Sequence, residues 1–187
     1  PEGLYPGDYL IEIAEFLATK FGDKLKSLPK DKALGEIRTI TIATIMRWIE
    51  KDLDRLGVRM DVYSSENDLV VKGKVSSAIN KLQKDGLIYQ GKPEPPKGQL
   101  ADDWEPREQL LFRSKKFGDD VDRALQKSDK TWTYFASDVA YHYDKLRRTK
   151  GKLIDILGAD HSGYVKRMTA AVQAISGKEE MLKVKQC

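Results

Sequence analysis

The sequence has almost no cysteine and no long apolar run. Its 187 residues include one cysteine, Cys187. A single cysteine forms no internal disulfide and builds no cysteine-based zinc site. No apolar stretch approaches the ~20 residues that cross a bilayer, and no export signal opens the chain. These absences predict a cytoplasmic location and no membrane partner.

The residues that hydrolases, kinases and metalloenzymes need are also missing. His142 and His161 have no acidic or cysteine partner at metal-ligand spacing. No serine lies in a nucleophile-elbow pattern, and no glycine-rich loop ends in Lys-Ser or Lys-Thr. The acidic segment 117–122 lacks the further positions of an EF-hand, so we expect a turn with solvated carboxylates. The sequence therefore predicts no metal site.

Charge of one sign is not concentrated along most of the chain. The 33 Lys and Arg residues face 29 Asp and Glu residues, for a net charge of +4. This mild excess permits an RNA partner without demanding one and gives no reason to expect DNA binding. The exception is a dense basic stretch that either complements a helix C-terminus or contacts tRNA phosphates. Its members are Lys145, Arg147, Arg148, Lys150 and Lys152.

With 40% hydrophobic residues, the chain has the composition of a globular protein. Apolar residues at helical spacing predict helices over 10–21 and 31–56. Asp8 is a candidate N-cap for the first helix, and Gly22 is its stop. Alternating apolar and polar residues over 58–62 predict a half-buried strand.

The middle of the chain contains an irregular segment between shorter elements. A helix is expected to start at 64–66 and to end before Gly86, and a short strand follows at 87–89. Four of the seven prolines lie within 91–107, which excludes regular structure there. Strands are predicted at 109–114 and 121–127, followed by a turn and a further short strand.

The final third alternates helix and strand with short connections. We predict a helix over 136–148, a strand at Leu153–Leu157, a helix over 162–175 and a strand from Leu182 onward. This order is half of a parallel, helix-covered sheet. The expected organisation is therefore a helix-rich region with one sheet strand (1–90), a Pro-rich insert (91–107), a β-hairpin region (108–135) and an αβαβ region (136–187).

The end of the predicted strand Leu153–Leu157 is a candidate ligand site. Ligands of parallel sheets collect beyond the carboxyl ends of strands. Gly158 would let a ligand approach the backbone, and Asp160 could bind ribose hydroxyls. In the simpler interpretation, Gly158 is only a turn and Asp160 only a helix cap.

Tyr134 and Asp138 form a second candidate site. Residues four apart share one face of a helix. A tyrosine hydroxyl beside a carboxylate suits a planar cation such as guanidinium. The alternative is an aromatic core residue next to a solvated carboxylate.

Several motifs, in their order and spacing, together resemble arginyl-tRNA synthetase, a class I enzyme. The resemblance extends almost from end to end. Its blocks are Tyr5-Pro-Gly-Asp-Tyr9, Asp61-Val-Tyr-Ser-Ser-Glu66, Phe112-Arg-Ser-Lys-Lys-Phe-Gly-Asp-Asp-Val-Asp-Arg123, Thr133-Tyr-Phe-Ala-Ser-Asp-Val-Ala-Tyr-His142 and Gly158-Ala-Asp-His-Ser-Gly-Tyr164.

The resemblance implies the second half of a class I Rossmann-like sheet, with a helical and β-hairpin insertion region. It implies that Tyr134 and Asp138 bind the arginine side chain and that Gly158, Asp160 and His161 lie against the adenosine of ATP. Arginine, ATP with its Mg²⁺ and arginine tRNA are then the expected partners, and no cofactor is tightly bound.

Two activation elements of that family, His-x-Gly-His and a Lys-Met-Ser-Lys-like loop, do not occur in this sequence. We therefore expect an internal piece of the enzyme, with no catalytic residue of its own and inactive alone. The first residue is not methionine, and the alternating pattern of a strand is cut short at the last residues, which favours the same expectation. Two alternatives are a stand-alone RNA-binding module derived from a synthetase and a structural piece that binds nothing.

Overall fold

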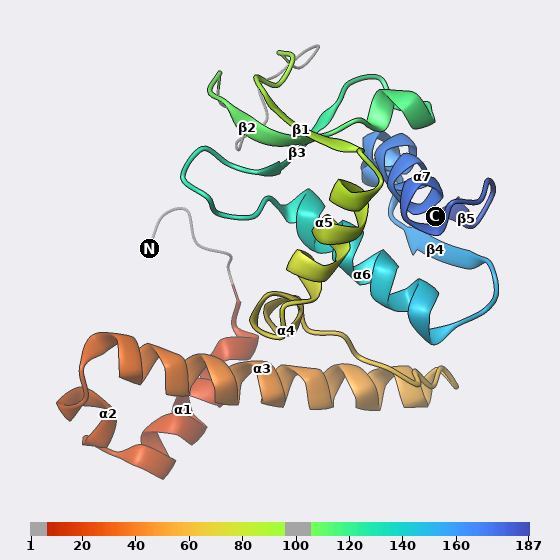
Figure 1. Cartoon of the computed structure of the whole chain (residues 1–187). Coiled ribbons are helices and arrows are strands. Elements are labelled where there is room, and N and C mark those ends of the chain that lie inside the picture. The colour runs from red at the N-terminus through yellow and green to blue at the C-terminus, as the bar shows by residue number, and fades with distance from the viewer. Residues whose placement is uncertain (1–6, 96–105) are drawn as a thin grey trace. The chain divides into compact units, whose positions relative to one another are not determined.

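The computed structural model describes residues 7–95 and 106–187. Residues 5–6 of the first quoted motif and most of the Pro-rich insert, at 96–105, lie outside the described residues. The chain forms two compact units, Pro1–Tyr63 and Ser64–Cys187 (Figure 1). No helix among the described residues is both long enough and apolar enough to span a membrane.

The first unit is helical. Its helices are α1 (Tyr9–Phe21), α2 (Lys24–Ser27) and α3 (Lys30–Arg55). Both long helices confirm the predictions from periodicity. Ile13 and Leu17 of α1 are buried, and Gly22 ends that helix with a φ of 52°. Asp8 stands at the N-cap of α1, but its side chain makes no capping hydrogen bond.

The strand predicted at 58–62 is wrong. These residues have no strand pairing, and all five are exposed. The amide of Val58 instead donates to the carbonyl oxygen of Leu53 at 2.8 Å, next to Gly57 with a φ of 73°. This bond closes the C-terminus of α3. Alternating residues fit a strand only where a neighbouring strand accepts their backbone bonds.

The second unit contains all strands of the described residues (Figure 1). Its elements are α4 (Glu66–Val71), α5 (Lys74–Lys84), β1 (Ile88–Gly91), β2 (Gln109–Phe112), the 3-10 turn η1 (Ser114–Phe117), β3 (Arg123–Gln126), α6 (Tyr134–Arg148), β4 (Leu153–Leu157), the 3-10 turn η2 (Ala159–His161), α7 (Ser162–Ser176) and β5 (Leu182–Gln186). The expected helix start is confirmed, because the side chain of Ser65 caps α4 by accepting from the amide of Asp68.

The strands form two small sheets. Strands β1, β2 and β3 are antiparallel, and Ile88 faces Phe112 across the first pair. Strands β4 and β5 are parallel, with Leu153 opposite Leu182, as the sequence predicted. The unit is therefore a mixed α/β structure whose parallel pair follows the predicted helix–strand–helix–strand order.

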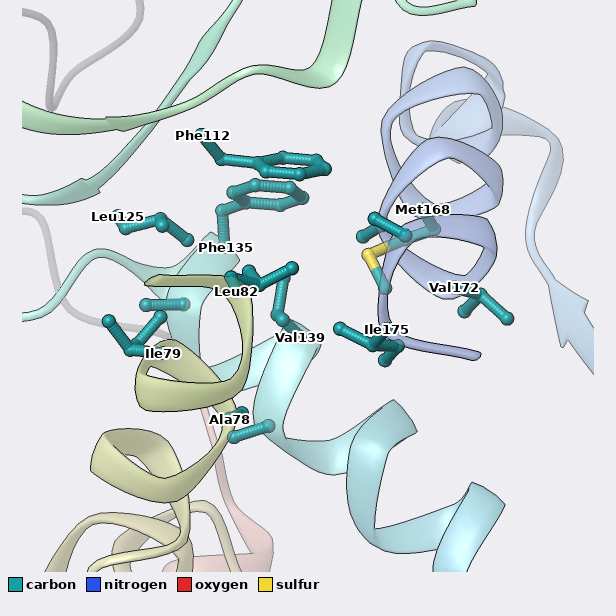
Figure 2. Close-up of a cluster of buried hydrophobic side chains, with 14 of the residues drawn as sticks. Ala78, Ile79, Leu82, Phe112, Leu125, Phe135, Val139, Met168, Val172 and Ile175 are labelled. Carbon is teal, nitrogen blue, oxygen red and sulfur yellow. The ribbon is translucent and has the colours of Figure 1, made fainter. Parts of the chain in front are cut away.

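The core of the second unit lies where α5, α6 and α7 meet the antiparallel sheet. Leu82, Phe112, Val139 and Met168 are all fully buried and come from these four parts. Figure 2 shows these side chains gathered between the ribbons of the three helices. The cluster holds α6 and α7 against each other, and the candidate residues Tyr134 and Asp138 lie on α6.

Candidate ligand site between α6 and α7

The N-terminus of α6 is fixed by Thr133. Its hydroxyl donates to the carbonyl oxygen of Ala124 at 2.8 Å and accepts from the amide of Ala136 at 3.2 Å. Tyr134 is the first residue of the helix, and 76% of it is exposed. Asp138 follows one turn later and is half-buried. The two predicted arginine-binding residues therefore lie in different environments.

The carboxylate of Asp138 faces α7, where the hydroxyl of Tyr164 donates a hydrogen bond to it. Burial raises the pKa of Asp138 above its ordinary value, although this bond and the charges of His142 and Arg167 oppose the rise. Burial and the neighbouring Asp138 raise the pKa of Tyr164 in turn. A carboxylate that has lost water in this way gains much from a cation that donates hydrogen bonds.

Arg167 extends this cluster along α7. Its guanidinium carbon lies 5.8 Å from the centroid of the Tyr164 ring. Burial and the nearby Arg123 lower the pKa of Arg167. Sequence reasoning did not identify Tyr164 or Arg167 as neighbours of Asp138. Sequence spacing shows which residues are one turn apart on the same helix. It does not show which side chains of another helix pack against them.

The predicted adenosine-binding residues lie at the end of β4. Gly158, Asp160 and His161 are all exposed there, around η2. A Cβ at Gly158 would lie 2.5 Å from Oδ1 of Asp160, an exposed side chain that can turn away. The ring of His161 makes an edge contact with Tyr164, with centroids 6.4 Å apart. Tyr164 thus contacts both predicted groups.

The basic stretch is more engaged than its sequence suggested. Lys145 donates to Oδ1 of Asp155 at 2.8 Å and lies 4.3 Å from the Tyr141 ring centroid. Arg148 pairs with Asp144 at 3.2 Å, and Lys152 lies 3.6 Å from Glu180. Arg147 stacks on Tyr143, and Lys150 is exposed. Lys145 is therefore the least accessible of the five to an outside phosphate.

The carboxylates of segment 117–122 are not all solvated, which corrects the expectation. Asp119 is buried and accepts two bonds from Arg123, both 2.7 Å long. Although burial alone would raise the pKa of Asp119, the bonds from Arg123 lower it. Asp122 accepts from the hydroxyl of Tyr89 at 2.9 Å. Only Asp120 is exposed, and it pairs with Lys166 of α7. In the described parts of the chain, no three His, Cys, Asp or Glu residues are grouped to hold a metal.

Comparisons with known proteins connect this arrangement to one enzyme. No family model matches the chain. Over 184 residues it is 55% identical to the arginine–tRNA ligase of Paracoccus denitrificans, covering 98% of this chain and 32% of the relative. The arginine–tRNA ligase of Ruegeria pomeroyi is 52% identical over 186 residues, with 100% and 32% covered.

A solved structure gives the same result. The crystal structure of an arginyl-tRNA synthetase from Campylobacter jejuni matches with a TM-score of 0.79 and 27% identity, over 100% of this chain and 38% of that one. The chain spans about a third of the length of the curated relatives it matches. Its homologues at 52–55% identity are arginine–tRNA ligases, as the motifs indicated.

Proposed function

We propose that this chain is part of an arginine–tRNA ligase and supplies walls of its arginine and ATP sites. The parent reaction joins the arginine carboxylate to the α-phosphate of ATP with release of pyrophosphate, and it then transfers the arginyl group from this adenylate to tRNA with release of AMP. ATP acts as a substrate that brings Mg²⁺ with it. Such a reaction belongs in the cytoplasm, where these substrates meet.

The observation that carries the proposal is the half-buried Asp138 carboxylate beside Tyr164. The guanidinium of arginine donates several hydrogen bonds in a fixed plane, which matches a carboxylate that burial has partly stripped of water. Tyr134 is exposed at the helix start and can cover the guanidinium face or donate its hydroxyl. Asp138 supplies the charge and Tyr134 the second contact.

The ATP part of the proposal uses the end of β4. Gly158, Asp160 and His161 are exposed beyond the carboxyl end of a parallel strand, the usual ligand position in such sheets. We propose that they contact adenosine and that the β4–β5 pair belongs to the second half of a Rossmann-like sheet. In the same proposal, 1–90 is a helix-rich part of the catalytic region, 91–107 is a Pro-rich insert and 108–135 is a β-hairpin region.

The tRNA contact is assigned to the exposed members of the basic stretch, Arg147, Arg148, Lys150 and Lys152. Arg148 and Lys152 already pair with acidic side chains. The net positive charge of the basic stretch is therefore small. A stand-alone RNA-binding module would need a stronger basic face, so we favour the ligase.

The proposal is tested by Asp138→Asn in a full-length ligase that carries this sequence. The substitution keeps the shape and removes the charge. Losing a charge-assisted hydrogen bond worth ~1.5–3 kcal/mol lowers arginine kcat/KM by roughly ten- to a hundredfold. The KM of ATP should change far less. Unaltered arginine kinetics would remove Asp138 from the site.

A matched control and a stability measurement separate binding from folding. Asp23→Asn makes the same change at a side chain that is 88% exposed, and it should leave arginine kinetics unchanged. Because the pKa of Asp138 is raised, stability is lost as pH rises through that pKa, and Asn escapes this loss. Asp138→Asn should therefore not lower the melting temperature at pH 7.

A further inference from the structure

His142 is a buried ionisable residue with no part in the proposed binding contacts. It is 2% exposed on α6. Its Nδ1 lies 2.7 Å from the carbonyl oxygen of Asp138, and its Nε2 lies 2.7 Å from Oδ2 of Asp155 on β4. The ring therefore spans from the helix that carries Asp138 to the strand that ends at Gly158.

The two oxygens determine where the ring carries protons. A backbone carbonyl oxygen can only accept, so Nδ1 must donate to it. The Asp155 carboxylate already accepts from Lys145 through its other oxygen at 2.8 Å. An ionised carboxylate is an acceptor as well, so Nε2 must also donate. A ring that donates through both nitrogens is an imidazolium.

The charges around the ring support this assignment. Burial raises the pKa of Asp155, but hydrogen bonds from His142 and Lys145 outweigh it and bring the value to about 2. The carboxylate is then ionised at neutral pH. The other charged or titratable groups that act on Asp138 and Asp155 are Lys145 of α6, Tyr164 and Arg167 of α7 and Glu66 of α4. The carboxylates of Asp138 and Glu66 favour a cation here, whereas Lys145 and Arg167 oppose one, so the assignment rests on the two hydrogen bonds of the ring.

We propose that His142 is a positioning residue, an imidazolium that ties the backbone of Asp138 to β4 and so sets the Asp138 carboxylate relative to the end of that strand. The role rests on the proposed arginine site, because it acts through Asp138. The protonation state of His142 does not depend on the arginine site, since it follows from the two hydrogen bonds of the ring. A change at His142 should shift Asp138 away from the guanidinium without removing any contact to arginine itself.

The protonation state is tested by nitrogen NMR of the chain labelled with ¹⁵N-histidine. The sequence has two histidines, and His161→Gln leaves a single set of ring signals, those of His142. We expect both ring nitrogens of His142 to carry protons at pH 7 and to show N–H correlations protected from exchange. One unprotonated, pyridine-like nitrogen would overturn the imidazolium bridge.

The positioning role is tested by a double-mutant cycle in the full-length enzyme. His142→Phe keeps an aromatic ring but donates no hydrogen bond. If His142→Phe does not fold, His142→Gln is used in its place. Arginine kcat/KM should fall about tenfold in the wild-type background and less than about twofold after Asp138→Asn, because coupled residues are not additive. Equal falls in both backgrounds would indicate general destabilisation and overturn the role.

The two proposals fail in different ways. An unmodified full-length enzyme that does not charge arginine would reject the ligase function, whereas the NMR result would still decide the state of His142. Normal arginine charging with additive losses would reject only the positioning role.

Discussion

At the scale of single residues, Asp155 shows how an apolar strand can contain a charged group. Strand β4 turns Leu153 and Asp155 inward and leaves Ile154 and Ile156 exposed. The inward carboxylate is acceptable because His142 and Lys145 both donate to it. A buried carboxylate without such partners would cost several kcal/mol.

The pH dependence of stability should reveal this pairing. The pKa of Asp155 falls from 3.8 to about 2, so its contribution is present above about pH 4 and is lost as pH falls toward 2. At ~1.4 kcal/mol per pKa unit, this contribution is roughly 2 kcal/mol. Asp155→Asn should therefore lower the free energy of unfolding by about that amount at pH 7, measured by urea denaturation. The difference in unfolding free energy between the wild-type chain and Asp155→Asn should become smaller near pH 2. A difference that stays constant with pH would show that it does not come from the charge of the carboxylate.

At the scale of elements, Gly73 divides the predicted helical stretch into α4 and α5. It precedes α5 with a φ of 67°, a left-handed conformation that costs other residues roughly 1–2 kcal/mol. A Cβ there would meet no atom within 4 Å, so the cost comes from the backbone alone. Gly73→Ala should destabilise the second unit by about 1 kcal/mol, measured by thermal or urea unfolding.

Gly35 provides a control of opposite sign. It lies within α3, and a Cβ there also meets nothing within 4 Å. Alanine is favoured over glycine in a helix interior by up to about 1 kcal/mol, so Gly35→Ala should raise the helix signal of α3. We expect Gly35→Ala to raise the unfolding free energy and Gly73→Ala to lower it. A change of the same sign and size in both variants would contradict the left-handed conformation at Gly73.

The elements also show how far sequence reasoning extends. Periodicity predicted α1, α3, α6 and α7, because the apolar residues on the buried face of a helix recur every three or four positions. The parallel pair β4–β5 followed from the helix–strand order. The failure at 58–62 has a physical cause, since alternation does not say whether a partner strand exists. Pairing of β1 with β2 across the Pro-rich segment is likewise a non-local property.

The candidate site divides in the same way. The one-turn spacing of Tyr134 and Asp138 could be read from the sequence, whereas their different exposure and the bond from Tyr164 to Asp138 depend on the packing of α6 against α7. Asp155 was hidden inside an apolar pattern, so its pairing with His142 had no local signal. Sequence reasoning therefore finds motifs more readily than the contacts that support them.

At the scale of the whole molecule, the chain should not activate arginine by itself. It contains neither a His-x-Gly-His element nor a Lys-Met-Ser-Lys-like loop, and in the proposed ligase such groups would stabilise the transition state that releases pyrophosphate. We expect no arginine-dependent ATP–pyrophosphate exchange above a blank, with tRNA present, and exchange in the full-length enzyme as the positive control. Clear exchange by the chain alone would show that it holds a complete activation site.

The two units should also differ in local stability within the isolated chain. All 26 residues of α3 remain outside a core, since none of them is buried, whereas α6 has six buried residues among 15. A helix with few buried apolar contacts opens at low free-energy cost. Hydrogen exchange followed by mass spectrometry should therefore show α3 amides exchanging well before those of α6. The core around Val139 and Met168 should give the slowest peptides, because opening it exposes fully buried side chains. Equal protection of α3 and α6 would mean that burial within each unit does not govern opening.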